Sequence, residues 1–120
     1  MENIKTIMEW HKETFPRAEL ISQARRVCAE FAEYKEADNY LNQIEELADV
    51  FIAWCGLLRF DVNAKMLPLY EEIARNFVMS DFVKAVQRKM NVNRQRSAED
   101  YWVWVDNKQQ YIAAHKFSNN

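Results

Sequence analysis

The chain has 120 residues, of which 49% are hydrophobic and 13% aromatic, and its formal net charge is −2. This size and composition allow one domain with a substantial apolar core, spanning residues 1–120, and exclude a disordered chain. The small net charge supplies no overall field that would attract nucleic acid or a membrane surface.

Glycine and proline are scarce, with one Gly and two Pro in the chain. Tight hairpins depend on these residues, so their scarcity predicts an all-α protein, a compact bundle of helices joined by short polar turns. The N-terminus has no apolar signal core, and the longest apolar run, 50–58, is too short to span a bilayer. We therefore expect a cytoplasmic protein, located in the host cytoplasm if a phage encodes it.

The two cysteines, Cys28 and Cys55, lie in different apolar segments and lack the close spacing of a zinc or redox motif. In a cytoplasmic protein we expect both to be reduced thiols in the core, with a disulfide as the alternative.

Hydrophobic periodicity and capping residues predict six helices. Pro16 suits the first position of the second helix, and Asp38-Asn39 provides a break and a cap before the third. Ser80-Asp81 is expected to cap the fifth helix, and Ser97-Ala98-Glu99-Asp100 has the pattern of a capping box for the last. The predicted helices cover residues 4–13, 16–37, 41–60, 64–77, 80–91 and 97–114.

The third helix changes character halfway along its length. Its first half carries Glu45, Glu46 and Asp49, whereas residues 50–58 are apolar on every side. A helix that is apolar all round is buried, so the acids one turn upstream are expected at the edge of the core.

Two acidic pairs share a three-residue spacing: Glu30 with Glu33, and Glu46 with Asp49. The short break between their helices makes the helices antiparallel neighbours, which would bring four carboxylates into one groove. Such a cluster would repel itself without a cation, and oxygen ligands without His or Cys suit Mg²⁺ or Mn²⁺. The alternative for each pair is a solvated helix face.

The pattern Glu30-x-x-Glu33, twelve intervening residues, then Glu46-x-x-Asp49 resembles the metal-binding motif of the MazG-like all-α NTP pyrophosphohydrolases. The segment from Trp10 to Pro16 is similar to the lead-in of phage-type members described as dATP/dGTP diphosphohydrolases. The likeness covers residues 4–96. It implies an antiparallel helix pair that binds Mg²⁺ beside a nucleoside triphosphate.

The likeness to this family is incomplete at the first acidic pair. Ala29 stands where the family often has a further acid, and Glu36 and Glu45 are extra acids. Each of these two acids could bind metal or simply be solvated.

Basic residues crowd the segment 84–96 of an otherwise acidic chain. Within it, Lys89-x-x-x-Asn93-x-x-Arg96 resembles the second motif of the family, in which Lys, Asn and Arg hold the triphosphate. Lysine supplies a point charge and arginine a bidentate fork for phosphate. The alternatives are a solvated helix face or a weak nucleic-acid patch. A nucleic-acid patch is disfavoured because Glu99-Asp100 would interrupt a continuous row of positive charge.

Aromatic residues supply further candidates for binding a base. Trp10 and His11 are the preferred ones, because related enzymes read the base with this early segment, whereas Trp54 is expected in the core. The aromatic residues of the last predicted helix are expected in the core or at a subunit contact. A di-iron carboxylate bundle is disfavoured because no Glu has a His three residues later.

The predicted activity is Mg²⁺-dependent hydrolysis of a (deoxy)nucleoside triphosphate to the monophosphate and pyrophosphate, with Mn²⁺ as a possible substitute. Glu33 is the expected general base, and Lys89 and Arg96 would stabilise the phosphate charge. A half-formed groove on a small chain suggests a homodimer or homotetramer. The alternatives are a catalytically silent helical interaction module, or the same chemistry on dCTP, dUTP or a guanosine alarmone.

Overall fold

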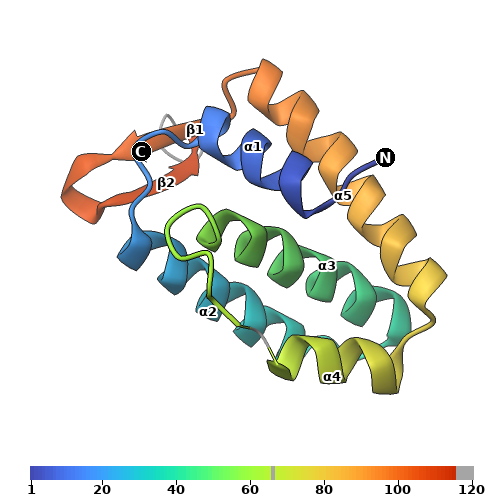
Figure 1. Ribbon diagram of the computed structural model, residues 1–120. Helices are drawn as coiled ribbons and strands as arrows, with labels where there is room; N and C mark the ends of the chain where they lie inside the picture. Colours follow the sequence, from blue (N-terminus) through green and yellow to red (C-terminus); the bar gives the residue numbers. More distant parts are fainter. Residues whose placement is uncertain (66, 116–120) are drawn as a thin grey trace.

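A computed structural model describes residues 1–65 and 67–115, and in this part of the chain five α-helices precede a two-stranded hairpin (Figure 1). Helix therefore dominates the fold, as the composition predicts. The elements are α1 (Ile4–Thr14), α2 (Leu20–Glu36), α3 (Tyr40–Leu57), α4 (Leu67–Asn76), α5 (Met79–Ala98), β1 (Trp102–Val105), the short 3₁₀ helix η1 (Asp106–Lys108) and β2 (Gln110–Ala113).

Helix α3 lies at the centre of the molecule and contacts all four other helices. It runs antiparallel beside α2, while α5 crosses it on the other side (Figure 1). Its apolar half is buried as expected, with Val50 and Cys55 fully covered. None of the described helices is long and apolar enough to cross a membrane.

The second helix begins at Leu20 and not at Pro16, so that part of the prediction is wrong. The intervening residues form a turn in which the N–H of Arg17 donates to the hydroxyl of Tyr111 at 2.9 Å. The N–H of Glu19 donates to the hydroxyl of Ser22, also at 2.9 Å, and starts the helix there. Local sequence patterns do not predict a contact with Tyr111, which is distant in the chain.

The last predicted helix, 97–114, is also wrong: α5 continues to Ala98, and a hairpin follows in which Trp102 pairs with Ala113 and Val105 with Gln110. Aromatic and β-branched residues dominate β1, which favours a strand. The Ser97 hydroxyl is not an N-cap, since it bonds the Asn93 carbonyl and accepts from the Trp10 indole N–H.

The chain makes these turns without glycine. Asp100 and Gln109 adopt the left-handed conformation, with φ of 52° and 51°. At the end of α5 the N–H of Tyr101 bonds the Arg96 carbonyl and the N–H of Asp100 bonds that of Ser97, which is a Schellman motif. Aspartate tolerates this conformation better than most residues, whereas Gln109 adopts it without that advantage. The scarcity of glycine therefore did not exclude a hairpin.

Three smaller predictions need correction. Helix α5 begins at Met79 after Val78, with no side-chain cap, so Ser80-Asp81 does not cap it. The predicted helix 64–77 includes residue 66, which lies outside the described residues, and α4 is observed from Leu67. Cys28 is an exposed free thiol, whereas burial raises the pKa of Cys55 to about 12.

Candidate metal and phosphate site

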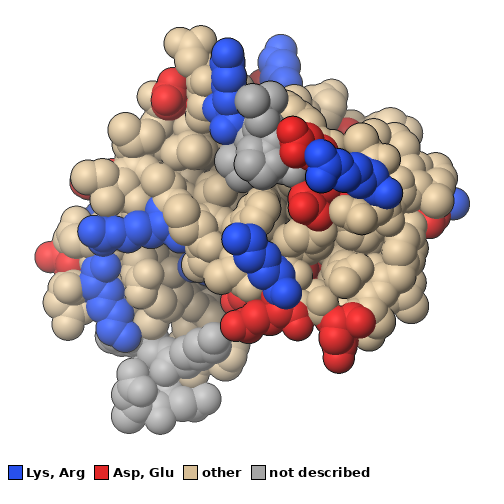
Figure 2. Space-filling model, turned by 90° about the horizontal axis from the view of Figure 1, so that it is seen from below, with Lys and Arg blue, Asp and Glu red and all other residues tan. Residues whose placement is uncertain are grey.

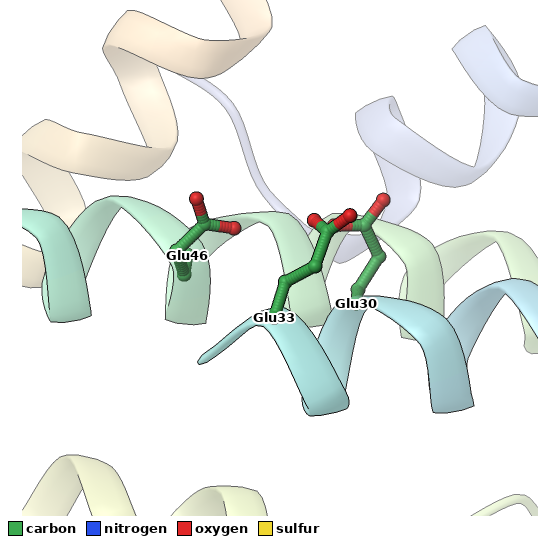
Figure 3. Close-up of side chains that lie close together, drawn as sticks. All are labelled: Glu30, Glu33 and Glu46. Carbon is green, nitrogen blue, oxygen red and sulfur yellow. The ribbon is translucent and has the colours of Figure 1, made fainter. Parts of the chain in front are cut away.

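Three glutamates converge in the groove between α2 and α3. Glu30 and Glu33 project from adjacent turns of α2, and Glu46 projects from α3 toward them (Figure 3). One carboxylate oxygen from each lies within 4.8 Å of the other two. The three-residue spacing on α2 and the short turn at Asp38-Asn39 produce this convergence, as the sequence predicts.

The cluster holds negative charge with little compensation. Burial, followed by the charges of Asp49 and Glu33, raises the pKa of Glu30 to about 7, although Arg26 lies 3.6 Å away. Burial and the same two acids raise the pKa of Glu46. Its Oε2 atom is buried and has no hydrogen-bond partner among the described residues. An unpaired buried oxygen beside two more carboxylates fits a hard divalent cation, which would supply the missing positive charge.

Asp49, the fourth predicted ligand, lies beside this cluster but is paired with a cation. The Lys89 ammonium is 3.1 Å from Asp49 Oδ2. Burial raises the pKa of Asp49 and Lys89 opposes that rise. The two extra acids noted in the sequence have different surroundings. Glu45 pairs with Arg88 and Lys89, whereas Glu36 is exposed at the end of α2.

A cavity of about 910 Å³ opens beside these acids. Helices α2, α3 and α5 and the hairpin wall it, and Glu30 and Asp49 reach its surface. The predicted phosphate-binding residues Lys89, Asn93 and Arg96 line the α5 side together. Two of the four metal candidates and all three phosphate candidates therefore line one cavity, although they lie far apart in the sequence.

The α5 residues differ in how they are held. Arg96 places its guanidinium 4.6 Å from the centroid of the Tyr101 ring, which leaves the N–H groups at its edge available. Among the described residues, the Asn93 amide hydrogen-bonds only to the Met90 sulfur, at 3.8 Å. A lysine ammonium has three donors, so Lys89 can contact a second anion while it remains bound to Asp49.

The predicted base-binding residues Trp10 and His11 also line the cavity, but both are buried. The Trp10 indole donates to Ser97 at 2.7 Å. In His11, Nδ1 accepts from the Arg59 guanidinium at 3.0 Å, since that group has only donors, and Nε2 donates to the Gln23 carbonyl oxygen at 2.8 Å. Their polar atoms thus already have partners within the protein, and only parts of the rings face the cavity.

The His11–Gln23 pair explains the only glycine in the chain. The Gln23 amide nitrogen donates to the Ala53 carbonyl at 2.7 Å, which anchors the pair on α3. A Cβ on Gly56 would lie 2.4 Å from His11 Cδ2 and 2.8 Å from the Gln23 amide nitrogen. Gly56 is therefore required for the close approach of α1 and α2 to α3 behind the cavity.

Other aromatic predictions have clear outcomes. Trp54 is in the core, as expected, and its indole donates to the Ala64 carbonyl at 3.2 Å. Trp102 packs on Trp10 and Phe15, with ring centroids 5.9 and 4.9 Å away. The hairpin thus covers the end of α1 and forms one wall of the cavity.

Sequence reasoning missed the hairpin wall and the two arginines Arg25 and Arg26 of α2, all of which line the cavity. The hairpin was missed because its residues were assigned to a helix. The four-residue spacing of Arg26 from Glu30 could have placed Arg26 near the metal candidates. Arg25 is five residues from Glu30, a spacing that carries no such signal.

The charges on one face of the molecule bear on the alternative of a nucleic-acid partner. On the face in Figure 2, uncharged and acidic surface interrupts the Lys and Arg side chains, so no continuous positive track crosses it.

The fold and site define a mostly helical protein with a carboxylate cluster at the edge of a cavity that basic residues line. No protein-family model matches the sequence, and neither the curated proteins nor the solved structures contain a significant match.

Proposed function

We propose that the protein is a Mg²⁺-dependent pyrophosphohydrolase of a (deoxy)nucleoside triphosphate. The observation that carries this proposal is the glutamate cluster with the unpaired Glu46 oxygen, beside a cavity that basic residues of α5 line. A nucleoside triphosphate matches this site, because enzymes neutralise its phosphate charge with both basic side chains and a bound metal. The resemblance to the MazG-like enzymes, which rests on the acidic and basic motifs, supports the same activity.

Glu30, Glu33 and Glu46 would hold the metal, with Asp49 as a further ligand. Mg²⁺ bound there supplies a Lewis acid that neutralises phosphate charge and lowers the pKa of a coordinated water, and Mn²⁺ can substitute. Glu33 is the exposed member of the cluster and is our choice as general base. It would accept the proton of the attacking water at a carboxylate oxygen.

Lys89 and Arg96 would stabilise charge on the phosphates, and Asn93 would supply a neutral donor. Trp10 and His11 would contribute ring surface to the base. Hydrolysis between the α- and β-phosphates would release the monophosphate and pyrophosphate.

Pyrophosphate release from a panel of nucleotides with Mg²⁺ tests the proposal. The panel contains dATP, dGTP, dCTP, dUTP and a guanosine alarmone, because the cavity leaves the base undecided. Glu46→Gln should abolish release, whereas Glu36→Gln, an exposed acid of α2 outside the cluster, should retain it. No release from any nucleotide, or full activity in Glu46→Gln, would refute the assignment.

A catalytically silent interaction module is the second candidate. The observation in its favour is that Lys89 pairs with Asp49 and Arg88 with Glu45. These pairs partly neutralise the acids that line the cavity. Calorimetry with Mg²⁺ and Mn²⁺ separates the two candidates, since a silent scaffold should show no saturable binding.

We also propose a homodimer or homotetramer. Exposed apolar side chains occur at the start of α3 and of α5, including Leu41, Val78 and Met79. Light scattering coupled to size-exclusion chromatography at micromolar concentration should report a mass above that of the monomer; a monomer alone would contradict this.

A further inference from the structure

The cavity carries an unequal distribution of charge. Its wall bears six basic side chains and three acidic ones, although the whole chain has a net charge of −2. Three of the basic residues are each paired with one of the acids: Arg26 with Glu30, Arg88 with Glu45, and Lys89 with Asp49. The other three, Arg25, Arg96 and Lys108, have no carboxylate within salt-bridge distance among the described residues.

The unpaired cations belong to one end of the cavity. Arg96 lies two turns beyond Lys89 on α5, about 10 Å further along the helix axis. Arg25 precedes Glu30 on α2, and Lys108 belongs to the turn of the hairpin. The start of α2 and the end of α5 both lie beside the hairpin (Figure 1). We call the part of the cavity wall that carries Arg25, Arg96 and Lys108 its basic end.

The basic end is held in place by the hairpin. The Arg26 guanidinium donates to the Tyr111 carbonyl at 3.4 Å, which ties α2 to β2. Tyr101, next to β1, supports the Arg96 guanidinium from one face. A guanidinium over a ring keeps N–H donors at its edge for a bidentate contact with an anion. Three cations around one cavity without acidic partners repel one another, and a polyvalent anion removes that repulsion.

We propose that Arg25, Arg96 and Lys108 form a polyphosphate-binding subsite, which holds the distal phosphates of the nucleotide away from the carboxylate cluster. This inference rests on the proposed function, because it takes the cavity to be the nucleotide site. It assigns phosphate binding to α2 and the hairpin as well as to α5. It also gives the hairpin a role in substrate binding.

The test measures binding without metal, so that it is independent of turnover. Inorganic triphosphate and dATP are titrated into the protein in EDTA at low salt by calorimetry. We expect both to bind saturably, and Arg25→Gln and Lys108→Gln each to weaken both roughly tenfold, as loss of a charge-assisted contact does. Lys84→Gln, which removes an exposed charge of α5 outside the cavity, is the matched control and should change affinity less than about twofold.

Each other outcome overturns the subsite. Equal weakening of binding by Lys84→Gln would indicate nonspecific attraction. Unchanged binding in Arg25→Gln and Lys108→Gln, or no binding by the unaltered protein, would refute the subsite. Binding of inorganic triphosphate without dATP would exclude a nucleotide as the source of the phosphates.

Turnover with Mg²⁺ separates the two proposals. Arg25→Gln should raise KM more than it lowers kcat. Charge-specific binding in EDTA with no pyrophosphate release from any nucleotide would refute the hydrolase and retain the anion site.

Discussion

The ammonium of Lys89 lies 3.1 Å from Oδ2 of Asp49, so a predicted phosphate ligand is bound to a predicted metal ligand. The pair connects α5 with α3 at the wall of the cavity. Burial raises the pKa of Asp49, and the Lys89 cation opposes that rise. In the proposed enzyme, Lys89 would therefore compete with a metal for Asp49 and would also place a positive charge beside the phosphates.

Replacing Lys89 should separate these two effects. Lys89→Gln is expected to bind Mg²⁺ more tightly in calorimetry, because the competing cation is removed. The same variant should lose roughly tenfold to a hundredfold in kcat/KM, because a charge on the transition state loses its partner. Lys84→Gln controls for net charge, and weaker Mg²⁺ binding by Lys89→Gln would contradict the competition.

Magnesium should stabilise the protein through the glutamate cluster. At a concentration about 100-fold above Kd, binding to the folded state alone contributes about 2.7 kcal/mol, which should raise Tm by about 10 °C. Glu46→Gln removes the oxygen that has no other partner, so the shift should disappear. Glu36→Gln should keep the full shift in thermal melts, and a shift that persists in Glu46→Gln would place the ion elsewhere.

His11 should make the folded protein sensitive to acid. Burial, and then the charge of Arg59, lowers the pKa of His11 from 6.5 to about 4. The unfolded chain therefore binds a proton between these values that the folded chain does not, so stability falls as pH drops from 6.5 to 4. The loss is on the order of 3 kcal/mol from this residue.

Urea unfolding of the protein and of His11→Gln at several pH values measures this loss. Glutamine does not titrate, and its amide can still donate to Gln23. Contributions from other groups are common to both proteins and cancel in the difference. The difference in unfolding free energy should shrink toward pH 4, whereas a constant difference would show that His11 does not titrate differently on unfolding.

The close approach at Gly56 should make even a methyl group costly. Gly56→Ala gains about 1 kcal/mol in helix propensity. The added Cβ would lie 2.4 Å from a buried ring that Gln23 and Arg59 hold in place, and overpacking of this kind costs about 1–3 kcal/mol. We expect a net loss of stability in urea unfolding. The loss should be smaller when Gly56→Ala is made in a His11→Ala background, and equal losses would show that the ring is not the obstacle.

Local patterns in the sequence determined the helices and the acidic half of the site. The apolar run 50–58 and the turn at Asp38-Asn39 define α3 and its antiparallel neighbour α2, and three-residue spacing then brings Glu30, Glu33 and Glu46 together. These features depend on contacts within one helix or across one short turn, which is why periodicity predicts them.

Only the tertiary structure decided the rest of the site. Lys89 pairs with Asp49 across 40 positions, and Tyr111 anchors the turn before α2 across 94. The hairpin forms because its aromatic residues pack on Trp10 and Phe15, and Asp100 and Gln109 make its turns without glycine. The sequence by itself predicted that Glu30, Glu33 and Glu46 meet, but not that Asp49 pairs with Lys89. Contacts between distant segments decided which cations face them, because burial and charge pairing depend on the whole packed chain.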